Sequence, residues 1–171
     1  MSAGPRAAPG GNRAAPGGAR LPVVAVVGRP NVGKSSLVNR IVGRRAAIVE
    51  ETPGVTRDRH HLSASWGGRE FEIVDTGGWL AGGRELDRQV SAQATRAMEE
   101  ADLLLLVLDA TVGMTSEDQA VVDLLRRWGR PALVIANKVD SAAREPDAWG
   151  LAGTGLGDPW IVSALHGRGA G

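Results

Sequence analysis

A glycine-bounded loop near the start of the chain carries the residues best suited to chemistry. Residues 28–35, GRPNVGKS, fit the pattern G-x-x-x-x-G-K-[ST]. In such a loop successive backbone N–H groups cradle phosphate oxygens, and Gly28 and Gly33 allow the tight turn that this requires. We expect the Lys34 ammonium to lie at the β- and γ-phosphates of a nucleotide and the Ser35 hydroxyl to bind Mg²⁺. The other predicted contacts in this segment are Asn31, Val32 and Ser36.

The residues around this loop argue against a chance match, which a chain with 24 glycines could produce. The apolar run at residues 23–27 predicts a strand buried on both faces, and apolar residues at helical spacing follow the loop up to Gly43. The alternative is a plain strand–turn–helix connection. Lysine use weighs against it, because only two of the 20 Lys and Arg residues are lysine, Lys34 and Lys138. A compact ammonium instead of the planar fork of Arg indicates a specific geometric need.

A second polar loop, NKVD at residues 137–140, follows the apolar run at residues 132–136. A carboxylate such as Asp140 accepts the N1–H and N2–H groups of guanine together, whereas adenine has an acceptor at N1 and no N2 amine. A well-enclosed site of this kind rejects the wrong base by roughly 10⁴-fold or more. We expect the Lys138 stem to lie over the base and Asn137 to tie this loop to the phosphate loop.

Two further loops complete the predicted site. Asp75 follows a buried strand and is expected to orient a water on the Mg²⁺ that Ser35 holds. Gly78, two residues beyond Thr76, is expected to donate its N–H to the γ-phosphate. Asp109 also ends a strand, but no glycine follows it, and we interpret it as structural. Near the end of the chain a backbone N–H, that of Ala164, is expected to reach guanine O6 from the segment Ser163, Ala164 and Leu165.

The composition indicates one domain of 171 residues with a net charge of +1. Both signs of charge are interspersed, so no direct nucleic-acid site is evident. The chain has no Cys, which excludes disulfides and thiolate zinc sites, and its longest apolar run is too short to span a bilayer. We therefore expect a cytoplasmic protein without membrane contact. The composition of residues 1–20 predicts a disordered tail, with a transit peptide as the alternative. Residues 21–171 are predicted to form the folded domain.

Strands and helices alternate along the folded part. This alternation predicts an α/β fold: a doubly wound, mostly parallel six-stranded sheet with one antiparallel edge hairpin turning at Gly67-Gly68. The expected strands are residues 23–27, 60–66, 69–75, 103–108, 132–136 and 160–162. The expected helices follow the phosphate loop and occupy residues 86–98 and 116–128, and residues 141–157 hold a short helix at most.

Four segments together resemble the first GTPase domain of the Der (EngA) family, bacterial ribosome-assembly GTPases of the translation-factor-like P-loop class. They are residues 28–35, 52–58, 75–79 and 163–169. The resemblance covers about residues 21–171. It implies binding of GTP and GDP with Mg²⁺, hydrolysis of GTP, and a switch that reports the nucleotide state to the large ribosomal subunit.

The resemblance also assigns roles to particular residues. Thr56 would close over Mg²⁺ in the triphosphate state, within a first switch, and residues 76–84 would form the second. Trp79 stands where many small GTPases carry a water-positioning Gln, so intrinsic hydrolysis should be slow. The family implies that Asn31 helps to bind a K⁺ that supplies positive charge at the phosphates.

Family members continue beyond this length with a closing helix, a second GTPase domain and a KH-like RNA-binding domain. We therefore expect a small-GTPase fold that lacks the closing C-terminal helix, with one sheet face partly uncovered. The leading functional hypothesis is a GTP-hydrolysing switch, and the alternative is a GTP/GDP-binding module with negligible hydrolysis. A P-loop ATPase or kinase is disfavoured by Asp140.

Overall fold

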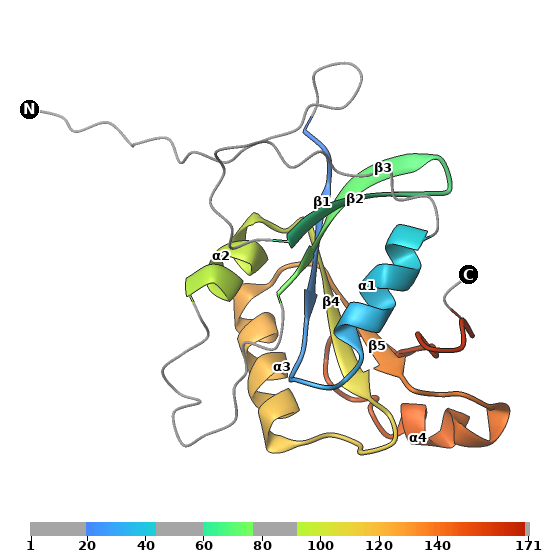
Figure 1. Ribbon diagram of the computed structural model, residues 1–171. Coiled ribbons are helices and arrows are strands. Elements are labelled where there is room, and N and C mark those ends of the chain that lie inside the picture. The colour runs from blue at the N-terminus through green and yellow to red at the C-terminus, as the bar shows by residue number, and fades with distance from the viewer. Residues whose placement is uncertain (1–19, 44–59, 77–91, 170–171) are drawn as a thin grey trace, which may run out of the picture.

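The computed structural model describes residues 20–43, 60–76 and 92–169 (Figure 1). Residues 1–19 of the predicted tail, the segment around Thr56, and the segment that contains Gly78 and Trp79 lie outside the described residues. Arg20, the last residue assigned to that tail, is described and binds Asp102.

Six strands form one sheet in the order β2-β3-β1-β4-β5-β6. Neighbouring strands are parallel except for the hairpin of β2 and β3 at one edge. The predicted α/β architecture is thus confirmed, and its hairpin turns at Gly67-Gly68 as expected. The strands are β1 (Val23–Val27), β2 (His60–Trp66), β3 (Arg69–Asp75), β4 (Leu103–Asp109), β5 (Ala132–Asn137) and β6 (Trp160–Ile161).

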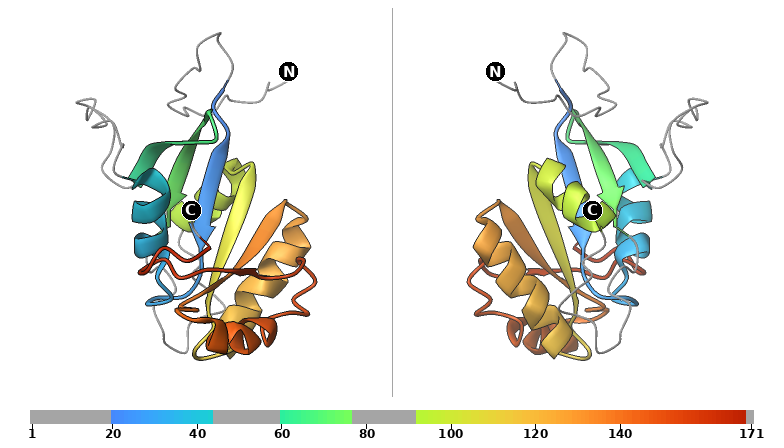
Figure 2. Two further views of the ribbon diagram at one scale, coloured as in Figure 1. Left: turned by 90° about the vertical axis from the view of Figure 1, so that its right-hand side faces the viewer. Right: turned by 90° about the vertical axis from the view of Figure 1, so that its left-hand side faces the viewer.

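Helices cover both faces of this sheet. Figures 1 and 2 show α1 on one side and α2 and α3 on the other. The sequence explains the two layers, because successive residues of a strand point to opposite faces. In β4, Leu104, Leu106 and Leu108 pack with α2 and α3, whereas Leu105 and Val107 pack with α1. The helices are α1 (Lys34–Val42), α2 (Ala92–Glu100), α3 (Ser116–Trp128) and α4 (Glu145–Trp149), and a 3₁₀ turn, Ala142–Arg144, precedes α4.

The carboxyl ends of the central strands meet at one edge of the sheet. Asp75 at the end of β3 is level with Val26 in β1, and Asp109 at the end of β4 is level with Asn137 at the end of β5. Open α/β sheets bind ligands at this edge. Polar residues far apart in the sequence are therefore brought together there.

The element ends differ slightly from expectation. β4 and β5 each run one residue further, to Asp109 and Asn137, because parallel backbone pairing continues through a polar side chain. Of the helix expected at residues 86–98, the described part begins at Ala92 and continues to Glu100. β6 ends at Ile161, one residue early, although the Val162 N–H still bonds Ala136 O at 2.9 Å.

The α1 side of the sheet is less fully covered towards β6. Leu133 of β5 and Trp160 of β6 are exposed there, at 36% and 62% of their surface. In the described chain after β6, residues 162–169 form turns and a bridge rather than a helix. Among the described residues no helix is long and apolar enough to cross a membrane.

Asp102 lies in the turn between α2 and β4 and holds the start of β1 by hydrogen bonds. Its carboxylate accepts the Val23 N–H at 2.8 Å and an Arg20 guanidinium N–H at 2.5 Å. Burial alone would raise the pKa of Asp102, but these two donors outweigh it and lower the pKa below its ordinary 3.8. The stabilisation is therefore present above about pH 3.8 and is lost as the pH falls through the folded-state pKa.

We expect Asp102→Asn to lower the free energy of unfolding at pH 7 by less than about 1 kcal/mol, because the pair with Arg20 is largely exposed. Urea unfolding at pH 7 and pH 3 measures this, and the difference between the two proteins should be smaller at the lower pH. Asp158→Asn, which removes an exposed carboxylate without a hydrogen bond in the described structure, is the control. A difference that grew towards pH 3 would contradict the assignment.

Candidate functional site

The phosphate loop connects β1 to α1 at the carboxyl edge of the sheet. Gly28 has φ 147° and Gly33 has φ 96°. A Cβ on Gly28 would lie 2.5 Å from Val107 O, and one on Gly33 would lie 2.3 Å from Asn137 Nδ2. Both glycines are therefore required by backbone shape and by close approach to β4 and β5.

The first turn of α1 is open to an anion. The helix begins at Lys34, and its N-cap residue, Gly33, offers no side chain to the free N–H groups. The partial positive charge at this end of a nine-residue helix favours phosphate. The loop and the helix thus present backbone donors to the same space.

Lys34 is buried, with 5% of its surface exposed. Its Nζ donates to Arg29 O at 2.7 Å. Burial lowers the pKa of Lys34 from its ordinary value, the nearby Asp75 carboxylate opposes this, and the Arg29 charge adds to the lowering. An anion beside this ammonium would stabilise its positive charge and so replace the hydration that burial removes.

Ser35 and Asp75 lie side by side, as the magnesium hypothesis requires. Ser35 Oγ donates to Asp75 Oδ2 at 3.2 Å. Thr76, next to Asp75, is anchored to β1 by its hydroxyl, which donates to Val26 O at 2.7 Å. Among the described residues no cluster of three or more His, Cys, Asp or Glu could hold a metal alone. A hydroxyl, a carboxylate and ligand phosphates are, however, the usual surroundings of Mg²⁺.

Asn137 joins the phosphate loop to the loop at residues 137–140, called the base loop below, as predicted. Its buried side-chain amide donates through Nδ2 to Val32 O at 2.8 Å and accepts the Ala164 N–H through Oδ1 at 2.9 Å. The Ala164 N–H expected at guanine O6 is thus engaged by Asn137 in this structure. The next N–H, that of Leu165, makes no hydrogen bond within the described residues.

Lys138 adopts the left-handed conformation at φ 68° and reaches back to the phosphate loop. Its Nζ donates to Asn31 O at 2.8 Å and to Asp109 Oδ2 at 2.7 Å. Burial would raise the pKa of Asp109, but hydrogen bonds from Lys138 and Thr111 outweigh it and hold the pKa below its ordinary value. Asp109, interpreted from the sequence as structural, accepts the Thr111 N–H and hydroxyl and also holds Lys138.

Asp140 is held by the last loop of the site. Ser163 Oγ donates to Asp140 Oδ1 at 2.7 Å and accepts the His166 N–H at 3.2 Å. The carboxylate is exposed, and Oδ2 accepts no hydrogen bond from the described residues. It can therefore accept from a ligand.

Arg29 of the phosphate loop contacts α3. Its Nε donates to Asp118 Oδ2 at 3.4 Å. That oxygen also accepts the Thr115 N–H and hydroxyl, while the Asp118 N–H bonds Thr115 Oγ1 in a reciprocal capping box. The Asp118 side chain is fully buried and that of Arg29 is 15% exposed.

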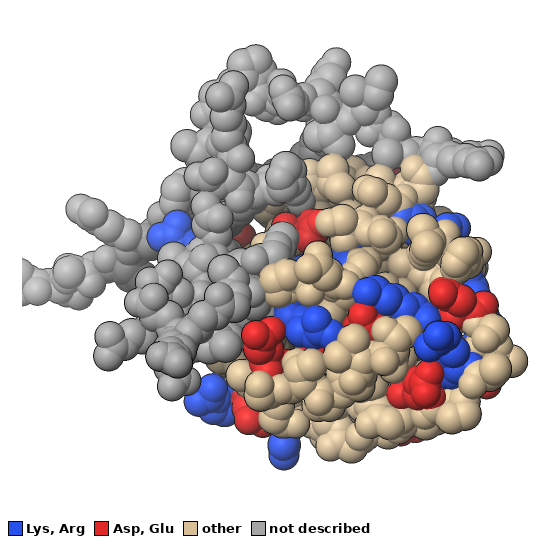
Figure 3. Space-filling view, turned by 60° about the horizontal axis from the view of Figure 1, so that its bottom comes forward, with Lys and Arg blue, Asp and Glu red and all other residues tan. Residues whose placement is uncertain are grey.

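A cavity of about 250 Å³ extends from the phosphate loop to the base loop. Sequence reasoning missed two of its residues: Thr111, signalled only by its position at a strand end, and Arg144, for which the sequence offers no signal. Thr56 and Gly78 lie outside the described residues. Figure 3 shows this end of the molecule, where basic and acidic side chains are intermixed. The lining residues are Gly33, Ser36, Thr111, Asn137, Lys138, Asp140, Arg144, Ser163 and Leu165.

Known proteins share this arrangement. Residues 23–138 match the model of the 50S ribosome-binding GTPase family. GTPase Der from Leifsonia xyli is 59% identical over 149 residues, covering 87% of this chain and 31% of that protein. GTPase Der from Streptomyces coelicolor is 59% identical over 151 residues, covering 88% and 32%. The chain thus spans about a third of the length of these relatives.

A solved structure agrees with the sequence matches. Era in complex with MgGDPNP and a segment of 16S ribosomal RNA superposes with a TM-score of 0.68 at 28% identity, covering 86% of this chain and 52% of that one. The resemblance to the first GTPase domain of Der is confirmed, and the chain belongs to the 50S ribosome-binding GTPase family.

Proposed function

We propose that this chain binds GTP and GDP with Mg²⁺ and hydrolyses GTP to GDP as a nucleotide-dependent switch. One observation carries the proposal. Gly33 and Ser36 of the lysine-bearing glycine loop line one cavity together with Asp140, whose carboxylate is open to a ligand, and the amide of Asn137 joins the loops. This arrangement suits a nucleotide with its phosphates at α1 and its base at Asp140.

At the base end, Asp140 accepts guanine N1–H and N2–H, and the Lys138 stem lies along the base. The O6 atom takes a backbone N–H from the segment that contains Ala164 and Leu165. The Leu165 N–H, which has no hydrogen-bond partner among the described residues, supports this, and the Ala164 N–H would first have to leave Asn137.

At the phosphate end, the N–H groups of the loop, from Gly28 to Ser36, surround the phosphates and Lys34 neutralises their charge. Ser35 would hold Mg²⁺ and Asp75 would orient a water on it, joined by Thr56 in the triphosphate state, and the Gly78 N–H would donate to the γ-phosphate. Bound Mg²⁺ would neutralise the charge that develops on the phosphate oxygens.

Single-turnover hydrolysis tests the enzymatic proposal against the alternative of a binding module. The chain is loaded with GTP and Mg²⁺ in K⁺ buffer, and GDP formation is followed over hours. Conversion that Lys34→Met abolishes supports the enzyme. Saturable GTP binding without conversion would support the binding module. ATP bound as tightly as GTP would revive the ATPase reading.

Replacing K⁺ with Na⁺ is expected to lower turnover by roughly tenfold or more, because a missing positive charge at the phosphates is costly in the transition state. Asn31 supports this role. Asn31 is exposed, and its backbone carbonyl accepts a hydrogen bond from Lys138. Its side-chain amide makes no hydrogen bond within the described residues. Asn31→Ala should abolish the difference between the two salts. Equal rates of the unaltered chain in both salts would contradict the K⁺ role.

We further infer that the nucleotide state is read by the large ribosomal subunit, and that the protein works in ribosome biogenesis in the cytoplasm. The description of the matched family supports this. Co-sedimentation with isolated 50S subunits, compared between GDP and a non-hydrolysable GTP analogue, tests it. Equal sedimentation in both states would contradict a switch.

A further inference from the structure

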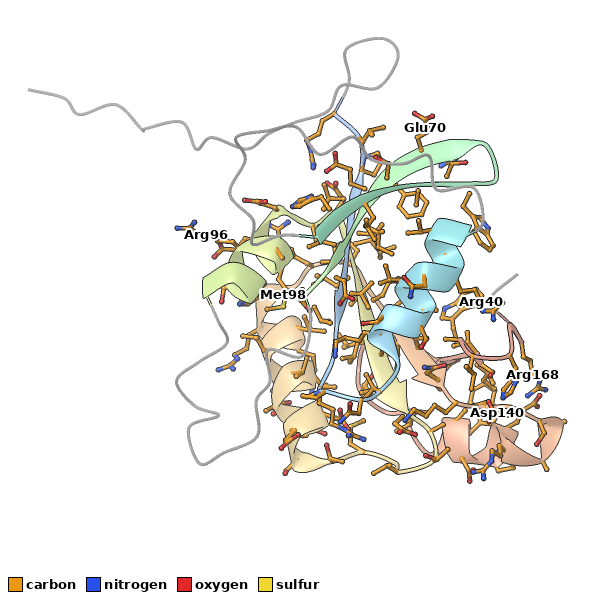
Figure 4. The ribbon with its side chains drawn as sticks, viewed as in Figure 1. Arg40, Glu70, Arg96, Met98, Asp140 and Arg168 are labelled. Atoms are coloured by element: carbon orange, nitrogen blue, oxygen red, sulfur yellow. The ribbon has the colours of Figure 1, made fainter. Side chains whose placement is uncertain are left out.

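Arg40, in the last turn of α1, reaches across to the last loop of the site, residues 163–168. Its Nε donates to Ala164 O at 2.5 Å and its Nη2 to Leu165 O at 2.8 Å. A basic residue at this place usually serves the carbonyls of its own helix end. Here the planar guanidinium instead spans two successive carbonyls of another segment. Figure 4 labels Arg40 on α1.

The segment at residues 163–168 is also held by hydrogen bonds to Asn137 and within itself. Ala164 is buried, and its N–H bonds Asn137, so both of its backbone polar groups are held. The Ser163 N–H bonds Arg168 O at 2.8 Å and closes the loop. Gly167 has φ 82°, and a Cβ there would lie 2.7 Å from Arg40 Nη1, so a glycine leaves room for the guanidinium.

The connection runs back to the phosphate loop through a rigid element. α1 begins at Lys34, six residues before Arg40, which is about 9 Å of helix. The loop that faces the base is therefore attached to the helix that starts at the phosphates.

We propose that Arg40 is a positioning residue for guanine recognition. It fixes the carbonyls of Ala164 and Leu165, and so aims the N–H groups of this loop at guanine O6. This role rests on the proposed function. Because charge-assisted hydrogen bonds to both carbonyls are lost, Arg40→Ala should speed GDP dissociation by roughly 10- to 100-fold.

The experiment uses a nucleotide that lacks the recognised atom. Dissociation constants are measured for GDP and for 6-thioguanosine diphosphate, which keeps the N1–H and the N2 amine but carries sulfur, a weak hydrogen-bond acceptor, in place of O6. The unaltered chain should prefer GDP, and Arg40→Ala should reduce that preference by roughly tenfold or more. Preference for GDP over inosine diphosphate should stay unchanged, because Asp140 reads N2. Equal weakening of all three nucleotides would mean a merely structural role and would overturn the proposal.

Two variants complete the design. Arg40→Lys keeps the charge but lacks the fork, so it should restore part of the preference and keeps the test open if the Ala variant fails to fold. Arg127→Ala removes an exposed arginine from the last turn of α3 and should change nothing. If the unaltered chain binds no guanine nucleotide, the proposed function fails and the inference with it. If it binds GDP and both Arg40 variants keep its preference, only the inference fails.

Discussion

Asp140→Asn is expected to weaken GDP binding by roughly 10³-fold or more and to create affinity for xanthosine diphosphate. The carboxylate accepts two guanine donors, and an amide in its place would point an N–H at the N2 amine. Xanthine carries a carbonyl at that position, which accepts from the amide. The Ser163 hydroxyl can still donate to the Asn oxygen, so the loop that holds Asp140 should keep its shape.

Competition of GDP and xanthosine diphosphate against a fluorescent guanine nucleotide measures this exchange of specificity. Asp158→Asn is the matched control, because it makes the same change on an exposed carboxylate that does not line the cavity. Its preference should equal that of the unaltered chain. An Asp140→Asn protein that still preferred GDP would remove Asp140 from the base site.

Asp118→Ala is expected to lower the free energy of unfolding by about 3–5 kcal/mol. One buried carboxylate oxygen accepts from Arg29 and twice from Thr115, so its loss removes one half of the reciprocal capping box and leaves a guanidinium with little exposure uncompensated. The pair itself adds less than this figure, because Arg29 Nη2 and Asp118 Oδ1 are buried without a partner in the described part of the chain. The expected loss of stability comes from removing one member of the Arg29–Asp118 pair and leaving the other with little exposure and no partner.

Urea unfolding followed by circular dichroism measures the change as a lower midpoint at constant slope. Asp123→Ala removes an exposed carboxylate from the same helix and should stay within about 0.5 kcal/mol of the unaltered chain. Within the described part of the chain this carboxylate accepts a hydrogen bond from Gln119 alone. Similar stability of the two variants would contradict the role given to Asp118.

Much of the fold follows from local sequence patterns. The β2–β3 hairpin and α3 have the predicted bounds, because Gly67-Gly68 supplies the positive φ values of a tight turn and an apolar stripe of period 3.6 identifies the helix. Continuous apolar runs identified β1 and β4, which are covered on both faces. The contact of Asn137 with the phosphate loop and the closeness of Ser35 to Asp75 were also expected, and both are confirmed.

Contacts between distant segments could not be predicted in the same way. Arg40 and its two carbonyl partners are more than 120 positions apart, and Lys138 and Asp109 are joined only because β4 and β5 end level. No local pattern specifies such pairs, since they depend on how the packed layers meet. The same holds for the Ala164 N–H, whose partner is decided by the packing of Asn137.

The amide of Asn137 has a consequence for which molecules fit. Because one short side chain binds Val32 O and the Ala164 N–H together, the span between the two recognition points is set by a single residue. In the proposed nucleotide site, we therefore expect a ligand to match that span as well as the chemistry at each end. A base joined directly to phosphate without a ribose would satisfy one end and miss the other.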